Sequence, residues 1–202
     1  MNEELYNKAT KADFSKILIN KGYAYFTKGK YNLNIIGIRH TSNSVTNKFD
    51  DVIVVEYIDM YGVRSREIFP ATTDPGITSM TKPVSYKGCA ILVPGQYRSA
   101  WKLGYHKGKY EAIVQYKPVK VYRDNNKDAV YDFNPKTIEE GTFGINIHKA
   151  GTHSTQVDNW SAGCQVFANK EDFEKFMKLV HYQISQGHGK LFTYTLINEE
   201  DL

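Results

Sequence analysis

Short β-rich runs separated by turn-forming residues are the feature that most constrains how this chain of 202 residues can fold. Glycine, proline, asparagine and aspartate interrupt the sequence repeatedly between residues 31 and 122, so no single run is long. This spacing is typical of an all-β sandwich or barrel and not of alternating βαβ units. The runs span residues 33–38, 52–58, 63–69, 89–93 and 112–116.

Helical patterns flank this β-rich region. Thr10 and Asp13 have the spacing of a capping box, and the apolar residues after them predict a short helix that ends near Gly22. A second helix is predicted over about residues 169–186, because Asn169 is followed by apolar residues at helical spacing.

We therefore expect one mainly β domain, sandwich- or barrel-like, over residues 31–202, preceded by a helical lead over residues 1–30. A final strand over about residues 190–197 is expected to close this domain. No internal repeat or low-complexity linker divides the sequence, which favours a single domain.

Composition excludes several classes of protein. Apolar residues make up 41% and charged residues 24%, which is typical of a globular chain. The net charge of +4 is too even to indicate a nucleic-acid binder. The longest apolar run covers only residues 89–93, whereas a membrane-spanning helix needs about 20 residues. The first residues lack an apolar stretch, so we expect synthesis in the cytoplasm without a secretory signal peptide.

The chain has two cysteines, Cys89 and Cys164, which excludes a disulfide-stapled mini-protein and a cysteine-based zinc site. One disulfide, two inert thiols or one nucleophile all remain compatible with this number. Cys89 lies in an apolar run, which favours a small core residue. Cys164 follows a Ser-Ala-Gly stretch that can bring backbone N–H groups close to a substrate carbonyl.

A histidine that could act as a base lies upstream of Cys164. In the run 144–148 two isoleucines alternate and are expected to point inward, so Asn146 and His148 face the other way. A thiol needs a base to become a thiolate near neutral pH, and imidazole serves this role at its ordinary pKa. The loop between His148 and Cys164 is long enough to bring the two together as a nucleophile–base pair. An inert cysteine and a surface histidine are the competing interpretation.

This segment resembles the signature of the L,D-transpeptidase catalytic domain, the YkuD-type fold. That family has a histidine, a loop of about this length and then Ser/Thr-x-Gly-Cys, which His148 and residues 161–164 match. Weaker similarity at residues 69–76 and 93–97 extends the likeness over about residues 33–197, but only the His–Cys segment is specific. The resemblance implies a mainly β L,D-transpeptidase fold that acts on peptidoglycan stem peptides, with no cofactor and no metal.

Carried over residue by residue, the resemblance makes Cys164 the nucleophile that attacks the carbonyl after the diamino acid of the stem peptide. His148 would accept the thiol proton and return it to the leaving amine, while a nearby backbone carbonyl orients the imidazole. The N–H groups of Gly163 and Cys164 would form the oxyanion hole, and Ser161 would hold the substrate or the loop. Either an amine or water could resolve the acyl-enzyme, so transpeptidase, carboxypeptidase and endopeptidase activities all stay open.

Four more residues are candidate substrate contacts: Asn146, Trp160, Ala162 and His153. Core or rim packing competes with this role for Trp160, and a solvated loop position competes for His153. Ala162 stands where the family commonly has histidine, threonine or arginine, and the two residues after the cysteine also depart from the pattern. These departures indicate a divergent branch and leave substrate preference open.

The aspartate-rich run 124–132 and the segment around His106 are both interpreted as turns. The run 124–132 has an oxygen spacing similar to a calcium loop, but Ala129 and Pro135 stand where that loop has glycine and glutamate. A β-turn rich in asparagine and aspartate fits this run better. His106, within Gly-Tyr-His-Lys-Gly, is interpreted as the tip of a hairpin.

The leading functional hypothesis is therefore a cysteine enzyme of the L,D-transpeptidase fold that binds peptidoglycan peptides. Without an export signal it would act as a phage-type lysin, as a virion-associated wall enzyme, or after release to the cell wall by another route. The alternative is a non-catalytic wall-binding or virion structural module with the same fold. A papain-like peptidase fits less well, because its nucleophile precedes its histidine in the chain. The sequence does not predict an oligomeric state.

Overall fold

The computed structural model describes residues 2–41 and 44–202. Within these residues, eight strands form a closed barrel in the order β1-β11-β5-β6-β9-β10-β3-β2, and a separate sheet has the order β4-β7-β8. The barrel strands are β1 (Asn34–Arg39), β2 (Asp51–Ile58), β3 (Arg64–Thr72), β5 (Gly95–His106), β6 (Tyr110–Gln115), β9 (Ile147–Lys149), β10 (Gln165–Phe167) and β11 (Leu191–Asn198). The smaller sheet contains β4 (Cys89–Leu92), β7 (Val119–Asp124) and β8 (Glu139–Gly141).

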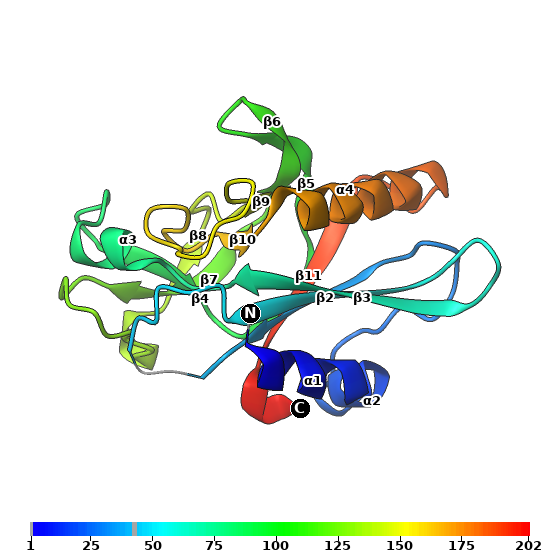
Figure 1. Ribbon diagram of the computed structural model, residues 1–202, viewed down its shortest axis with the longest axis horizontal. Coiled ribbons are helices and arrows are strands. Elements are labelled where there is room, and N and C mark those ends of the chain that lie inside the picture. The colour runs from blue at the N-terminus through cyan, green and yellow to red at the C-terminus, as the bar shows by residue number, and fades with distance from the viewer. Residues whose placement is uncertain (1, 42–43) are drawn as a thin grey trace.

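Helices cover the barrel on two sides (Figure 1). In this view α1 and α2 lie below β2 and β3, near the C-terminus, and α4 lies above them. The expected mainly β domain is thus a barrel rather than a sandwich. The helices of the described residues are α1 (Glu3–Lys11), α2 (Phe14–Asn20), α3 (Ile77–Thr81) and α4 (Lys170–Ser185), with 3-10 turns η1 (Pro135–Thr137) and η2 (Glu199–Asp201).

The strand β2 is buried on both faces along residues 52–55, which explains the unbroken apolar run there. Val52 and Val54 pack in one cluster with Phe14 of α2. Ile53 and Val55 point the other way into the main core, where the apolar face of α4 also packs. Because successive side chains of a strand alternate between its faces, one strand connects the two clusters.

The predicted helix after Asn169 is confirmed as α4. The side chain of Asn169 accepts a hydrogen bond from the Asp172 N–H at 2.9 Å, which caps the helix. The buried face of α4 includes Phe173, Phe176 and Val180, at the helical spacing read from the sequence. This face closes the main core beside β9 and β10.

The start of the N-terminal helix differs from the sequence prediction. Asp13, not Thr10, caps α2, because the Asp13 side chain accepts from the Lys16 N–H. Thr10 belongs to the preceding helix α1, which is additional to the predicted helices and which Asn2 caps. The helix α2 ends at Asn20, close to the expected end at Gly22.

Trp101 in β5 links the core to the run that precedes β9. Its side chain is fully buried, and its Nε1–H donates a hydrogen bond of 2.7 Å to the Ile145 carbonyl. Ile145 and Ile147 are both buried in the main core, as their alternation predicted. The run 144–148 is therefore held from its inward side, and the side chains between the isoleucines face outward from this core.

No helix within the described residues combines the length and the hydropathy needed to span a bilayer.

Candidate active site

Two short parallel strands position the candidate nucleophile and base. In the pairing of β9 with β10, Val166 lies opposite His148. Cys164 directly precedes β10, and the pairing continues there because the Gln165 N–H donates to the Asn146 carbonyl at 2.9 Å. Side chains two positions apart on a strand share a face, so Cys164 and His148 are diagonal neighbours on one face.

The thiol of Cys164 is half-buried against the run that precedes β9. The Asn146 N–H donates to Sγ at 3.4 Å, and Sγ lies 3.5 Å from the Gly144 carbonyl oxygen. Burial raises the pKa of the Cys164 thiol, and the hydrogen bond from Asn146 opposes this effect without reversing it. The resting side chain is therefore a neutral thiol at neutral pH.

The imidazole of His148 is held in one tautomer. Its Nδ1 lies 2.9 Å from the Lys149 carbonyl oxygen, and because a carbonyl only accepts, Nδ1 carries the hydrogen. The other nitrogen, Nε2, is buried and has no hydrogen-bond partner among the described residues. Burial first, and then the nearby His106 and Lys107, lower the pKa of His148 to about 3. The ring is thus neutral at pH 7, with a lone pair on Nε2 that the thiol does not engage.

A second histidine, His106, completes the cluster. Its ring stacks on His148 with centroids 3.9 Å apart, and the residue is 7% exposed. The Asn146 Nδ2 lies 3.2 Å from His106 Nδ1 and donates to it, while the Gln115 N–H donates to the Asn146 side-chain oxygen at 3.0 Å. Burial lowers the pKa of His106, and two neighbouring lysines lower it further.

The predicted hairpin is confirmed, but His106 is the last strand residue before its tip and not the tip itself. His106 pairs with Tyr110 as the last pair of β5 and β6, so residues 107–109 form the tip and His106 points into the site. The Tyr110 hydroxyl also reaches the cluster, because it donates to the Lys149 carbonyl at 3.2 Å. Neither residue has a local sequence signal, since only the pairing of β6 with β9 brings this hairpin to His148.

Ser161 braces the turn that leads into Cys164. Its side chain is fully buried, and its hydroxyl accepts from the Gly163 N–H at 3.1 Å and donates to the Cys164 carbonyl at 2.8 Å. Gly163 has a φ of +130°, and a Cβ there would lie 2.0 Å from the Ala90 carbonyl oxygen, so only glycine fits. The Gly163 N–H is thus engaged within the turn, which differs from the expected role as an oxyanion donor.

The expected substrate contacts are distributed over different parts of the surface. The side chain of Asn146 holds His106 and the edge of β6 through the bonds described above. Ala162 is exposed and lines a cavity of about 400 Å³ beside the Cys164 turn. Trp160 is 43% exposed in the loop between β9 and β10.

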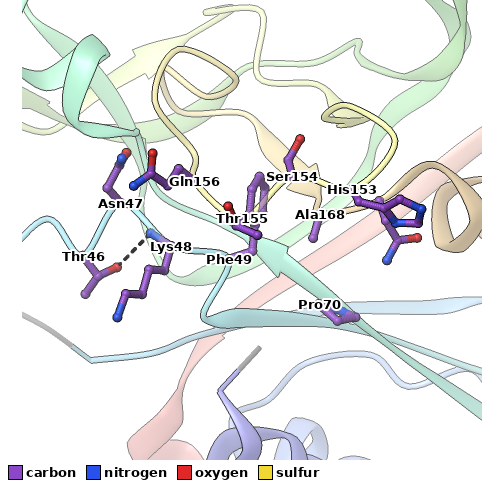
Figure 2. A pocket seen from close by; sticks show the side chains of 11 residues that line it. Thr46, Asn47, Lys48, Phe49, Pro70, His153, Ser154, Thr155, Gln156 and Ala168 are labelled. Carbon is purple, nitrogen blue, oxygen red and sulfur yellow. Dashed lines mark hydrogen bonds between the residues drawn. The ribbon is translucent and has the colours of Figure 1, made fainter.

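His153 lies at a different cavity, away from the cluster. This cavity, of about 490 Å³, is shown in Figure 2, where His153 and Ala168 line one part and Lys48 another. Neither Cys164 nor His148 lines it. The structure therefore does not bring His153 to the candidate nucleophile.

The aspartate-rich run after β7 uses its oxygens for turn bonds. Asp128 accepts from the Val130 N–H at 2.8 Å, and Asp124 accepts from the Asp132 N–H at 2.8 Å. The bond of Asp128, to the residue two positions on, is typical of an Asx turn, and the bond of Asp124 ties the far end of the run back to β7. Among residues 2–41 and 44–202, no group of three or more histidine, cysteine, aspartate or glutamate side chains is placed to hold a metal ion.

Comparisons with family models, with curated proteins and with solved structures find no match to this chain. The resemblance to L,D-transpeptidases therefore stands on the motif residues alone. The groups that could carry chemistry at this site are Cys164, His148 and His106.

Proposed function

We propose that this protein is a cysteine acyl-transfer enzyme that acts on peptidoglycan stem peptides through an acyl-enzyme at Cys164. The observation that carries the proposal is the placement of a half-buried thiol on the same face as His148, whose Nε2 is unpartnered. A fixed tautomer with an unused acceptor is what a general base for a thiol requires. The substrate class comes from the resemblance of the His–Cys segment to L,D-transpeptidases.

The neutral state of both groups favours a general-base mechanism over a preformed thiolate–imidazolium pair. As Cys164 Sγ attacks the peptide carbonyl, His148 Nε2 would accept the thiol proton, and the Lys149 carbonyl would stabilise the ring through Nδ1–H. A side-chain movement has to bring Sγ to Nε2 when substrate binds, because catalytic hydrogen bonds often tighten only in the complex. An imidazole with a pKa of about 3 is a weak base, so this first proton transfer is expected to limit the rate.

The same low pKa favours the second half of the reaction. Once protonated, His148 is a strong acid next to His106, and it would give its proton readily to the leaving amine. The acyl group would then remain on Sγ until an amine or water attacks it. An amine acceptor makes the reaction a transpeptidation, and water makes it a carboxypeptidase or endopeptidase cleavage.

A second candidate function has its own support. Burial raises the pKa of Cys164 and lowers that of His148, and the thiol donates no hydrogen bond to the ring. A buried neutral pair of this kind also fits a wall-binding or virion structural module that keeps the fold without turnover. Such a module would bind peptidoglycan and leave its peptides unchanged.

Mass spectrometry of muropeptides after incubation with the purified protein separates the two functions. New cross-links between stem peptides would indicate a transpeptidase, and shortened stems a hydrolase. Cys164→Ala should abolish either change, whereas Cys89→Ala, at the other cysteine, should retain it. Unchanged muropeptides with the folded wild-type protein would reject the enzyme, and binding to intact wall fragments would then favour the module.

A further inference from the structure

The cavity of about 400 Å³ that Ala162 lines lies against the turn before Cys164, and its lining includes neither Cys164 nor His148. Its lining also includes Phe143. The next residue, Gly144, has its carbonyl oxygen 3.5 Å from Cys164 Sγ. Ala90 of β4 also belongs to the wall and lies directly against the Cys164 turn. A peptide with its scissile carbonyl at Sγ would reach this cavity by passing Ala162.

Arg123 gives the cavity a positively charged wall. Its guanidinium lies over the ring of Phe143, 4.6 Å from the ring centroid. This cation–π contact holds the guanidinium against an apolar side chain of the cavity. Nε donates to Glu139 at 3.0 Å, and Nη1 makes a long bond of 3.5 Å to the Gly88 carbonyl. Nη2 donates no hydrogen bond to any of residues 2–41 and 44–202, although a guanidinium has five N–H donors.

Another arginine beside a cavity shows the contrast. Arg66 donates to the Glu56 carboxylate and to the backbone carbonyls of Ala9, Thr10 and Ala12, so each of its three nitrogens is engaged. Its guanidinium therefore serves the packing of α1 on the barrel. The guanidinium of Arg123, in contrast, keeps donors for a group that enters the cavity.

The charges around the cavity leave room for one more anion. Glu139 receives both Arg123 and Lys87, whose Nζ lies 2.7 Å from the carboxylate. Two cations therefore share one carboxylate. The nearby Asp124 is 3% exposed, accepts from a backbone N–H of its own loop and does not line the cavity.

We propose that this cavity binds a carboxylate of the acyl-donor peptide, with Arg123 as its partner and Phe143 and Ala90 as the apolar walls. This inference rests on the proposed function, because it assumes that a peptide binds with its carbonyl at Cys164. A guanidinium and a carboxylate form a charge-assisted pair, which fixes orientation as well as affinity. The small side chain of Ala162 keeps the entrance to the cavity open.

Binding of a stem tetrapeptide to the Cys164→Ala protein, measured by isothermal titration calorimetry, tests the inference without turnover. Three forms of the peptide identify the carboxylate: the free acid, its C-terminal amide, and a form with glutamine in place of glutamate. We expect that the peptide in which the bound carboxylate is replaced by an amide binds about tenfold more weakly than the free acid. In the Cys164→Ala protein, a second substitution Arg123→Gln should remove this difference in affinity. The control Arg98→Gln, outside the cavity, should preserve it.

Equal affinity for all three peptides would overturn the inference, as would an unchanged preference after Arg123→Gln. If Arg123→Gln does not fold, Ala162→Phe provides the second test, because it fills the entrance from an exposed position and should weaken the free acid by a similar factor. Unchanged affinity in Ala162→Phe would also count against the cavity. Failure of the proposed function is distinguishable, since it appears as unchanged muropeptides in the turnover assay whatever the binding result.

Discussion

The imidazole rings of His106 and His148 are stacked, with centroids 3.9 Å apart and 23° between their planes. His106 ends β5, and His148 lies in the middle of β9, so the stack joins two strands that are not adjacent in the barrel. Two cationic rings at this distance would repel each other, and His106 therefore lowers the pKa of His148. A residue on a distant hairpin thus helps to set the protonation of the candidate base.

Replacing His106 should change the pKa of His148. In His106→Ala the face of the His148 ring that His106 covers becomes accessible to water. The pKa of His148 should therefore rise from about 3 toward the ordinary value of about 6.5. His106→Phe keeps an apolar ring on that face, and the pKa should stay low. NMR titration of the His148 side chain measures both. An unchanged pKa in His106→Ala would show that the stack does not control this group.

His148 should also destabilise the fold in acid. Between about pH 6.5 and pH 3 the unfolded chain binds a proton at this residue and the folded protein does not, so stability falls as the pH falls. Relative to His148→Gln, the wild type should lose on the order of 1 kcal/mol of unfolding free energy per pH unit in this window. Urea denaturation at several pH values measures this slope.

The comparison with His148→Gln is needed because other buried groups change the unfolding free energy with pH in the opposite direction. Burial raises the pKa of Asp51 and of Asp74, so the folded state holds their protons more tightly and their contribution to stability is lost as the pH rises. Cys89→Ala, which removes no group that titrates in acid, should keep the wild-type slope. Parallel curves for wild type and His148→Gln would contradict a buried neutral His148.

Glycine at position 163 should be far harder to replace than glycine at position 187. Both have positive φ, but a Cβ at Gly187 meets nothing within 4 Å, whereas at Gly163 it would overlap the Ala90 carbonyl. Gly187→Ala should cost about 1 kcal/mol of unfolding free energy from backbone strain alone. Gly163→Ala should cost clearly more and should displace the Cys164 turn. Equal costs in chemical denaturation would mean that the contact with Ala90 relaxes easily.

The two cysteines should differ in reactivity toward iodoacetamide. Cys164 is half-buried, whereas Cys89 is 3% exposed and burial raises its pKa to about 12. Peptide mapping after brief alkylation should find Cys164 labelled first, at a rate that increases with pH because the pKa of this thiol is also raised. Equal and slow labelling of both thiols would favour the structural module.

Elements with a strong local pattern could be predicted from the sequence, and elements that depend on packing could not. The helix α4 follows from its cap at Asn169 and its regular apolar face. The strand β5 was missed because Gly95 and Gly104 look like turn residues. Gly104 instead permits a close approach, since a Cβ there would lie 2.6 Å from the Val114 side chain.

The same division holds for the site. The run around His148 and the turn before Cys164 are close in sequence, so their approach through β9 and β10 could be anticipated. The stacking of His106 and the bracing role of Ser161 could not, because both follow from contacts that form only when the barrel closes. Arg123 is likewise placed by β7 of the smaller sheet, far from the motif in sequence.

Intact-protein mass spectrometry of an acid-quenched reaction tests the central claim most directly. After incubation with a stem tetrapeptide, the wild type and Cys89→Ala should gain the mass of the acyl fragment, and digestion should locate it on Cys164. Cys164→Ala should gain nothing. A folded wild-type protein that processes the peptide without any adduct at Cys164, or an equally active Cys164→Ala protein, would contradict the account.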